Sequence, residues 1–476
     1  MATLPFRVFA AFLITTAFLI FAVSLSAVGP SAKPTANRFL IRGNLVTPDG
    51  VVPNAWLDIL NGRIEQIERD RPNLPGVPAL ETNDLIFPGF IDLHNHPGFN
   101  VFPRWTPPRK FPNRYAWRSL DAYRAVLEDR QHALTAGGAN FCDIDEYVEV
   151  KALIGGTTSM IGFSGREPAR VLPDCIKGLV RNLDVFTGFY GAEQGHERIV
   201  NSIGVLPLDM DANTASRIAR ELADGSIDLL AIHIAEGLPT DAESAQELDL
   251  LDARGLLTAH TALIHAVGLS PSQLARVHRA GASIVWSPRS NFELYGATAN
   301  VAAAFREGVT ISLAPDWSPS GSDNMFDEIK YAERMNREGL DSLFSARQLV
   351  EMASTIPARV ARIDDKVGRL APGMLADLFL VHGTDSAAAG DPYRAITAGS
   401  ITNIDLVMIG GVPQYGDADF LHALNVKTEP LTVCGVTRAL NTDALPNGSF
   451  AEVEARLKEK MKAVGSELAP LAGCVP

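Results

Sequence analysis

The chain has 476 residues, a formal net charge of −13, and a composition with 46% hydrophobic and 20% charged residues. Such a composition is typical of a globular protein with enough length for a large core, and the length suggests about three domains unless an α/β barrel takes about 250 residues as one. A nucleic-acid-binding protein usually presents a basic surface, so the acidic balance argues against that class of partner.

The first residues contain a targeting signal. Arg7 precedes an apolar run at residues 8–28, and small residues follow it in SLSAVGPSA. This order is typical of a secretory signal peptide. The run is also near the ~20 residues that span a bilayer, so an uncleaved anchor stays open as the alternative. We expect residues 1–32 to be a signal peptide or membrane anchor, and the protein to be exported to a periplasmic or extracellular location.

Export would allow the cysteines to form disulfides. The four cysteines permit three complete pairings, and their spacing is not that of a zinc knuckle. A bond between Cys434 and Cys474 would fasten the C-terminal tail.

Short strands and turns are predicted on both flanks, and strands alternate with helices between them. Segments 211–225, 270–282 and 299–309 have the apolar spacing and the terminal residues of helices. Repeated strand–helix units predict a parallel sheet, open or closed. A further helix is predicted in the tail, within SFAEVEARLKEKMKAV.

Ionisable side chains lie at the ends of several apolar strands. They are His94 and His96, then His233 and His265, and finally Asp316. In a parallel barrel the carboxyl ends of all strands open onto one face, so residues distant in sequence meet there. Imidazole and carboxylate groups are suitable ligands for a divalent first-row metal.

The His-x-His pair has a geometry of its own. Residues i and i+2 of an extended strand point to the same face, so both rings can reach one ion while Asn95 turns away. The alternative for His94 and His96 alone is a pair of surface histidines beyond a strand.

Taken together, the motifs resemble those of the amidohydrolase superfamily, and most of all its branch of cytosine/guanine deaminases and triazine chlorohydrolases. The resemblance covers roughly residues 38–415 and rests on FPGFIDLHNHP, GGTTSM, IHIAEG, ALIHAVGLS, VWSPRSNFELYG, LAPDWSPSGSDN and VGRLAPGMLADLFLV. It implies a distorted (β/α)8 TIM barrel with a small β-sandwich built from both flanks. The expected parts are sandwich residues 33–88 and 366–415, barrel residues 89–365, and a C-terminal extension, residues 416–476, with one helix.

The resemblance also implies roles for the residues at the strand ends. His94, His96, His233 and Asp316 match the metal ligands. His265 matches the histidine that contacts the attacking water or the substrate, and Glu236 matches the acid of the family's His-x-x-Glu motif. Each assignment has an alternative. For His233 it is a core histidine, for Glu236 a helix N-terminal carboxylate, and for Asp316 a helix cap. For His265 the alternative is that His260 is the matching histidine.

The lysines bear on the number of metal ions. Members of the superfamily with two metals bridge them with a carboxylated lysine on the fourth strand. Lys177 is the only lysine between residues 152 and 329, and it precedes the third predicted strand, while Lys151 comes too early. We expect one divalent ion per chain, with zinc favoured over iron or manganese, and Glu193 as the alternative bridge.

The segment after His96 is rich in aromatic and cationic residues. Trp105 and Arg114 belong to it, and Arg289 and Asn291 follow the seventh strand. These four are the candidates for contact with a flat, anionic or carbonyl-rich substrate. The alternative is a surface loop with its aromatic rings packed beneath it.

The sequence therefore predicts an exported mononuclear hydrolase of a carbon–nitrogen bond in an amide, a cyclic amide or an amino-substituted ring of a small molecule. In the resulting mechanism, Asp316 accepts a proton from the metal-activated water, His265 orients it, and Glu236 protonates the leaving nitrogen. A hydrolytic dehalogenase of the same branch and a non-catalytic binding relative are the alternatives. The oligomeric state does not follow from the sequence.

Overall fold

The structure is a computed structural model that describes residues 37–138, 140–162, 179–184, 199–202, 210–383 and 390–474. The expected targeting segment, residues 1–32, lies outside the described residues. Among the described residues, no helix has the length and apolar character needed to span a bilayer.

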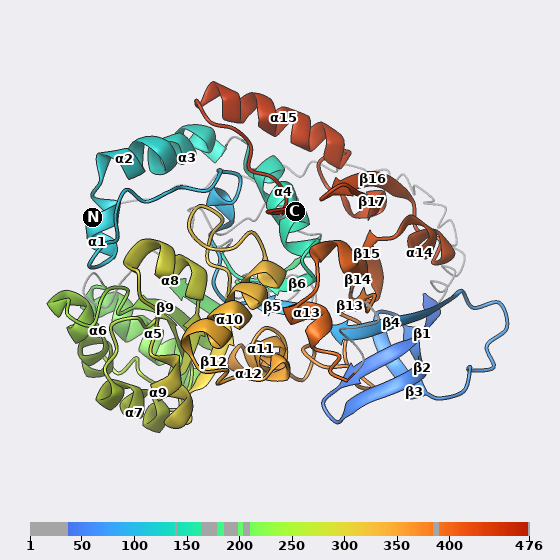
Figure 1. Ribbon diagram of the computed structural model, residues 1–476, viewed down its shortest axis with the longest axis horizontal. Helices are drawn as coiled ribbons and strands as arrows, with labels where there is room; N and C mark the ends of the chain where they lie inside the picture. The colour runs from blue at the N-terminus through green and yellow to red at the C-terminus, as the bar shows by residue number, and fades with distance from the viewer. Residues whose placement is uncertain are drawn as a thin grey trace, which may run out of the picture. The chain divides into compact units, whose positions relative to one another are not determined.

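Strands from both flanks of the chain form one nine-stranded sheet (Figure 1). Its central pairing is between β4 and β13, which come from opposite sides of the barrel sequence. The two flanks therefore join through backbone hydrogen bonds in one sheet, where the sequence predicted a small β-sandwich. The strands in spatial order are β16 (Thr428–Val433), β17 (Val436–Asn441), β15 (Val412–Gly416), β14 (Ile404–Ile409), β13 (Leu378–Val381), β4 (Ala79–Pro88), β1 (Arg38–Thr47), β2 (Gly50–Leu60) and β3 (Arg63–Glu68).

The remaining eight strands are parallel and belong to the (β/α)8 barrel. They form a three-stranded group, β5-β6-β7, and a five-stranded group, β12-β11-β10-β9-β8. The Asp316 amide donates to the His94 carbonyl at 3.1 Å, which connects the end of the eighth strand to that of the first. The bounds are β5 (Phe90–Asp92), β6 (Thr157–Met160), β7 (Arg181–Asn182), β8 (Ile199–Ser202), β9 (Leu229–Ile234), β10 (Thr261–His265), β11 (Ser283–Trp286) and β12 (Thr310–Leu313).

The three helices predicted between the strands are confirmed as α5 (Ala212–Asp224), α7 (Pro271–Ala280) and α9 (Val301–Arg306). The Asp211 carboxylate accepts the Thr214 amide at 2.7 Å and begins α5. Ser270 and Gln273 form a capping box at the start of α7, and Gly281 ends it with a left-handed φ of 72°.

The other helices cover the barrel or lie in its loops. The segment after His96 contains α1 (Arg114–Arg118), α2 (Asp121–Tyr123) and α3 (Asp129–Leu134). Those that follow are α4 (Phe141–Leu153), α6 (Ala242–Ala253), α8 (Pro288–Tyr295), α10 (Met325–Gly339), α11 (Ala346–Glu351), α12 (Thr355–Val360) and α13 (Arg394–Thr397).

The C-terminal extension contains the predicted helix as α15 (Phe450–Ala463), which lies along α4 (Figure 1). The extension also contains α14 (Ala418–Ala423), β16 and β17, so the expectation of one helix alone was incomplete. The two strands form the edge of the sheet, where β17 pairs with β15 and β16 pairs with β17.

The tail beyond α15 returns toward the barrel. The Ala469 amide donates to the Val101 carbonyl at 2.9 Å, and Tyr147 donates to the Ala469 carbonyl. Cys434 and Cys474 form the expected disulfide, and Cys142 is also disulfide-bonded, while Cys175 lies outside the described residues. The tail is therefore held at both ends against the barrel and the sheet.

Candidate active site

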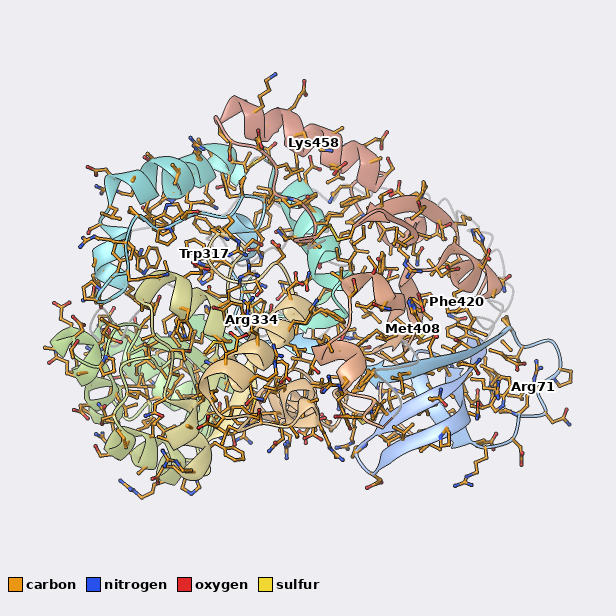
Figure 2. The ribbon with its side chains drawn as sticks, viewed as in Figure 1. Arg71, Trp317, Arg334, Met408, Phe420 and Lys458 are labelled. Carbon is orange, nitrogen blue, oxygen red and sulfur yellow. A yellow bond between two sulfur atoms is a disulfide. The ribbon has the colours of Figure 1, made fainter. Side chains whose placement is uncertain are left out.

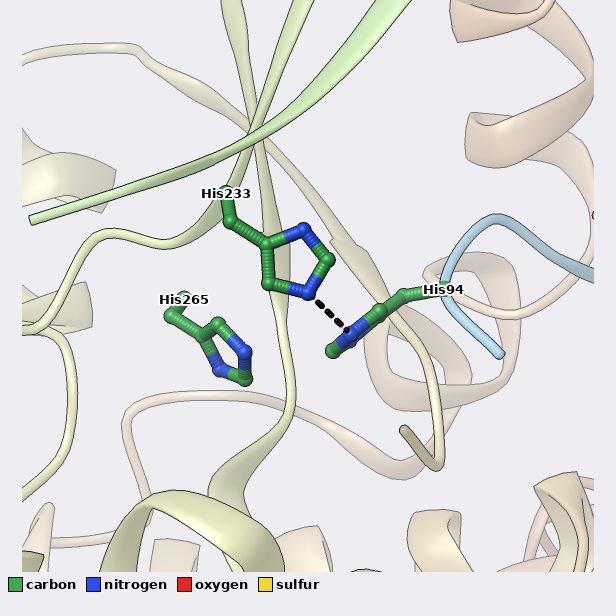
Figure 3. A group of neighbouring side chains, drawn as sticks. All are labelled: His94, His233 and His265. Atoms are coloured by element: carbon green, nitrogen blue, oxygen red, sulfur yellow. Dashed lines mark hydrogen bonds between the residues drawn. The ribbon is translucent and has the colours of Figure 1, made fainter. Parts of the chain in front are cut away.

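Four side chains from three strand ends converge at the carboxyl face of the barrel. The Nε2 atom of His94 lies 3.3 Å from His96 Nε2 and 3.2 Å from His233 Nε2. The Oδ1 atom of Asp316 lies 3.3 Å from His94 Nε2 and 3.2 Å from His96 Nε2. Figure 3 shows the contact between the His94 and His233 rings, with the His265 ring beside them.

These spacings fit a divalent metal. Zinc ligands lie about 2.0–2.1 Å from the ion in a tetrahedral arrangement, so two ligand atoms are separated by about 3.3–3.4 Å. The four measured separations, from 3.2 to 3.3 Å, agree with this value. The ligand atoms fall into two mutually close groups, His94 with His96 and Asp316, and His94 with His233 and His265, so His94 belongs to both.

Burial keeps the ligand side chains in the protonation states that metal binding requires. It lowers the pKa of His94 and of His233 well below the usual value, so both rings are neutral at pH 7. Burial raises the pKa of Asp316, but the His94 and His96 rings lower it by more, and the net shift is downward. A site with neutral imidazoles and an ionised carboxylate needs to lose no proton when the metal binds.

The His-x-His pair lies just beyond a strand rather than on one, because β5 ends at Asp92. Asn95 turns away from the two rings, as predicted, and donates to the Asp92 carboxylate at 2.6 Å. Asp92 also accepts the His94 amide at 3.0 Å. The buried Asp92, whose pKa burial raises to about 7, therefore shapes the turn that presents the two histidines.

Two strand ends at the site have left-handed backbone conformations. His265 has a φ of 68° and Asp316 a φ of 66°, which non-glycine residues seldom adopt. The ordinary alternation of a strand does not continue through His265, and its ring lies 4.7 Å from the His94 ring between centroids. Such conformations cost about 1–3 kcal/mol each and persist where the surrounding structure enforces them.

Glu236 lies next to this group and is held from several sides. Tyr295 donates to Glu236 Oε1 at 2.6 Å and accepts a hydrogen bond from Trp117 Nε1 at 2.8 Å. His265 Nε2 lies 3.6 Å from Glu236 Oε1, and Arg114 Nη1 lies 3.5 Å from Glu236 Oε2. Glu236 is 3% exposed, so its carboxylate faces a protein-lined space rather than bulk water.

The segment after His96 reaches Glu236 because a glycine leaves room for it. The Arg114 amide donates to the Glu236 carbonyl at 3.0 Å, and the Leu238 amide donates to the Pro112 carbonyl at 2.7 Å. A Cβ at Gly237 would lie 2.7 Å from that Pro112 oxygen, closer than real side chains approach. The glycine of the IHIAEG motif therefore permits the close approach of the two chains.

The four candidate substrate residues occupy different places. Asn291 Oδ1 lies 2.8 Å from His265 Nδ1, and Arg114 is buried against Glu236, so both contact predicted catalytic residues. Trp105 is 9% exposed and packs among aromatic rings, including that of Tyr123 at 5.5 Å. Arg289 lines a separate pocket beside α10. Contact of these residues with a substrate stays a prediction.

The remaining histidines and lysines lie away from this group or outside the described residues. His260 is at the opposite end of β10 from His265, with its Nδ1 3.0 Å from the Asp228 carbonyl. Lys151, on α4, pairs with Asp323 at 2.8 Å. Among the others, His132, His278 and His422 are exposed and His382 pairs with Asp405, whereas Lys177, Glu193 and His196 lie outside the described residues.

Sequence reasoning missed two supporting residues of α8. Ser287 precedes the helix, and its hydroxyl lies 2.8 Å from His94 Nδ1, which leaves Nε2 free to face the site. Tyr295, at the end of the helix, positions Glu236. Both lie within the quoted VWSPRSNFELYG motif, but nothing in the sequence shows which partners a serine or tyrosine will find.

Comparisons with known proteins agree with this geometry. A family model described as the amidohydrolase family matches residues 228–413. A curated 5-methylthioadenosine/S-adenosylhomocysteine deaminase from Haloarcula marismortui is 25% identical over 71% of this chain and 83% of its own length.

Two solved structures share the fold. An adenosine deaminase from Xanthomonas campestris with bound zinc has a TM-score of 0.65 at 15% identity and covers 90% of this chain and 98% of its own. Atrazine chlorohydrolase TrzN from Arthrobacter aurescens TC1, complexed with zinc, has a TM-score of 0.66 at 17% identity. It covers 89% of this chain and 99% of its own. Residues 228–413 therefore match the amidohydrolase family, and the chain is a metal-dependent hydrolase that acts on carbon–nitrogen bonds other than peptide bonds.

Proposed function

We propose that the chain is a mononuclear deaminase that removes an exocyclic amino group from a nitrogen heterocycle of the aminopurine class. The observation that carries this proposal is the position of His94 Nε2, which lies 3.2–3.3 Å from ligand atoms of His96, His233 and Asp316, with the Glu236 carboxylate beside His265. The purine-ring class is supported by the names of the curated relative and of the adenosine deaminase that shares the fold.

His94, His96, His233 and Asp316 would hold one divalent ion, with zinc favoured over iron or manganese. When bound there, the ion supplies a water molecule whose pKa is lowered toward about 7. Asp316 would accept a proton from this water. His265, fixed by Asn291 at 2.8 Å, orients the water and stabilises the charge that develops at the ring carbon.

Glu236 delivers a proton to the leaving nitrogen. An amide anion is a very poor leaving group, so the carbon–nitrogen bond breaks only when a proton reaches the nitrogen. Tyr295 occupies Oε1 of Glu236 with a hydrogen bond, and Arg114 lies 3.5 Å from Oε2. These contacts fix the carboxylate near His265, where the substrate ring must lie.

A single metal ion is supported by the lysines. Lys151 is 1% exposed and pairs with Asp323, so it does not serve as a bridge between two ions. The sequence after β8 contains no lysine before the fifth strand.

We further propose that the enzyme is exported. The sequence of residues 1–32 supports this, and so does the Cys434–Cys474 disulfide, because such bonds persist in oxidising compartments.

Metal content provides the first prediction. The purified enzyme should bind about one divalent ion per chain, and His94→Ala and Asp316→Asn should each lose the ion and the activity, because each removes a ligand. Elemental analysis measures the ion independently of turnover. His278→Ala is the matched control, since this exposed histidine contacts the Gly308 carbonyl and should leave the metal content unchanged. Full metal content in both ligand variants would contradict the assignment.

Glu236 and Tyr295 provide the second prediction. Glu236→Gln should keep the metal and lower kcat by about 10²–10⁴-fold, because the proton donor is lost. Tyr295→Phe should lower kcat by about tenfold to hundredfold through misplacement of the carboxylate. Steady-state kinetics on metal-loaded protein measures both. Tyr393→Phe, a change in a buried tyrosine on the far side of the sheet junction, should leave kcat unaltered.

Ammonia release distinguishes the reaction types. Incubation of the metal-loaded enzyme with adenosine, 5′-methylthioadenosine, guanine, cytosine, a hydantoin, an acyl-amino acid and a chlorotriazine should give ammonia from at least one aminopurine. Release of a larger amine from an amide substrate alone, or of chloride from the triazine alone, would refute deamination and identify the alternative chemistry.

Cell fractionation tests export. The mature protein should occur in the periplasmic or extracellular fraction, with Cys434 and Cys474 protected from alkylation until a reductant is added. N-terminal sequencing distinguishes cleavage near residue 32 from retention of a membrane anchor through residues 8–28. Recovery of the chain in the cytosol with both thiols reactive would contradict export.

A further inference from the structure

A cationic pocket lies beside α10, apart from the predicted metal ligands. It has a volume of about 530 Å³ and is lined by six basic side chains, namely Arg104, Arg289, Lys330, Arg334, Arg337 and Arg394. None of His94, His96, His233 or Asp316 lines it. Figure 2 labels Arg334 on α10. Such a concentration of positive charge is unexpected in a chain with a formal net charge of −13.

The acidic residues of the pocket do not neutralise these cations. Asp323 is engaged by the buried Lys151 at 2.8 Å, and the Glu333 carboxylate accepts the Asn336 amide. Burial, followed by the nearby Asp323, raises the pKa of Asp327 to about 6, so this carboxyl holds its negative charge less readily than usual. In the described part of the chain, no carboxylate forms an ion pair with Arg104, Arg289, Lys330, Arg334 or Arg394.

The Arg289 guanidinium is held in place with one donor unused, whereas Arg104, Arg334, Arg337 and Arg394 are exposed. The Arg289 and Arg334 guanidiniums lie 5.7 and 4.7 Å from the centre of the same Tyr331 ring. Arg289 Nε is buried and has no hydrogen-bond partner. Burial and the charge of Arg289 lower the pKa of Arg104, which places two like charges near each other. A bound anion would stabilise two guanidinium groups that lie near each other, and it would accept a hydrogen bond from the unused Nε–H of Arg289.

The C-terminal tail contributes to the same pocket. Gly473 lines it, and a Cβ at that position would lie 3.2 Å from Asp323 Oδ2. The adjacent Cys474 is fixed by its disulfide with Cys434. The Cys434–Cys474 disulfide therefore holds the tail in position as part of the pocket wall.

We propose that this pocket is a second ligand site, which binds a small molecule through carboxylate or phosphate oxygens. Planar guanidinium groups match both of these groups with paired hydrogen bonds. The site does not depend on the proposed deamination, since it shares none of the predicted metal ligands.

Calorimetric titration of the full-length, metal-loaded protein tests the proposal. Inorganic phosphate, sulfate and succinate are the probes, at low ionic strength, and at least one should give a saturable one-site isotherm that weakens as sodium chloride is added. Tighter binding of phosphate and sulfate would identify a phosphate-type ligand, and tighter binding of succinate a dicarboxylate. Absence of saturable heat for all three probes would overturn the proposal.

Variants locate the binding. Arg334→Gln and Arg394→Gln should each weaken the affinity by about tenfold or more, because each removes a charge-assisted hydrogen bond. Arg279→Gln is the matched control, since it removes an exposed arginine on α7 and should leave the affinity unchanged. Equal affinities in all three variants would overturn the assignment, and thermal unfolding confirms that each is folded.

Asp316→Asn separates this site from the metal centre. Binding of the probe anions should persist in that variant, whose metal site is impaired. Loss of the heat in Asp316→Asn together with its retention in Arg334→Gln would place the anion at the metal centre and refute the second site.

Discussion

The backbone hydrogen bond from the Asp316 amide to the His94 carbonyl is the contact on which the site depends. It measures 3.1 Å and connects the end of the eighth barrel strand to the turn after the first. The His-x-His pair and the aspartate are 220 residues apart in the sequence, and only this junction places their donor atoms within 3.3 Å. The strained φ of 66° at Asp316 is tolerated because the barrel enforces the junction.

Helix α8 provides the second level of support. Ser287, just before the helix, contacts His94, Asn291 contacts His265, and Tyr295 donates to Glu236. One short helix therefore sets the orientation of a predicted ligand, a predicted water-orienting histidine and a predicted acid. Its first turn also carries Arg289, which enters the cationic pocket. The helix thus contributes residues to both proposed sites.

The sequence was sufficient to predict those site residues that a local sequence pattern marks. His94, His96, His233, His265 and Asp316 each end an apolar strand, and the parallel barrel brings strand ends together, so their convergence could be anticipated. The structure confirms the resemblance to the family, the fold class and the Cys434–Cys474 bond. The partners of these residues could not be anticipated, because Ser287 and Tyr295 acquire them only through the packing of α8.

The candidate substrate residues lie in two different places. Arg114 and Arg289 were grouped because both are cations near strand ends. The structure separates them, since Arg114 is buried beside Glu236 and Arg289 lies in another pocket. Spacing in the sequence indicates which edge of the barrel a side chain approaches, but not which of two cavities at that edge it enters.

The segment after His96 therefore also contacts the residues that position Glu236. Trp117 holds Tyr295, Arg114 approaches the Glu236 carboxylate, and the Arg114 amide donates to the Glu236 carbonyl. Arg114, a candidate substrate residue, and Trp117, which contacts Tyr295, thus belong to one helix, α1. A change in this segment that admits a different ring would also move Glu236, so substrate selection and proton delivery are physically coupled.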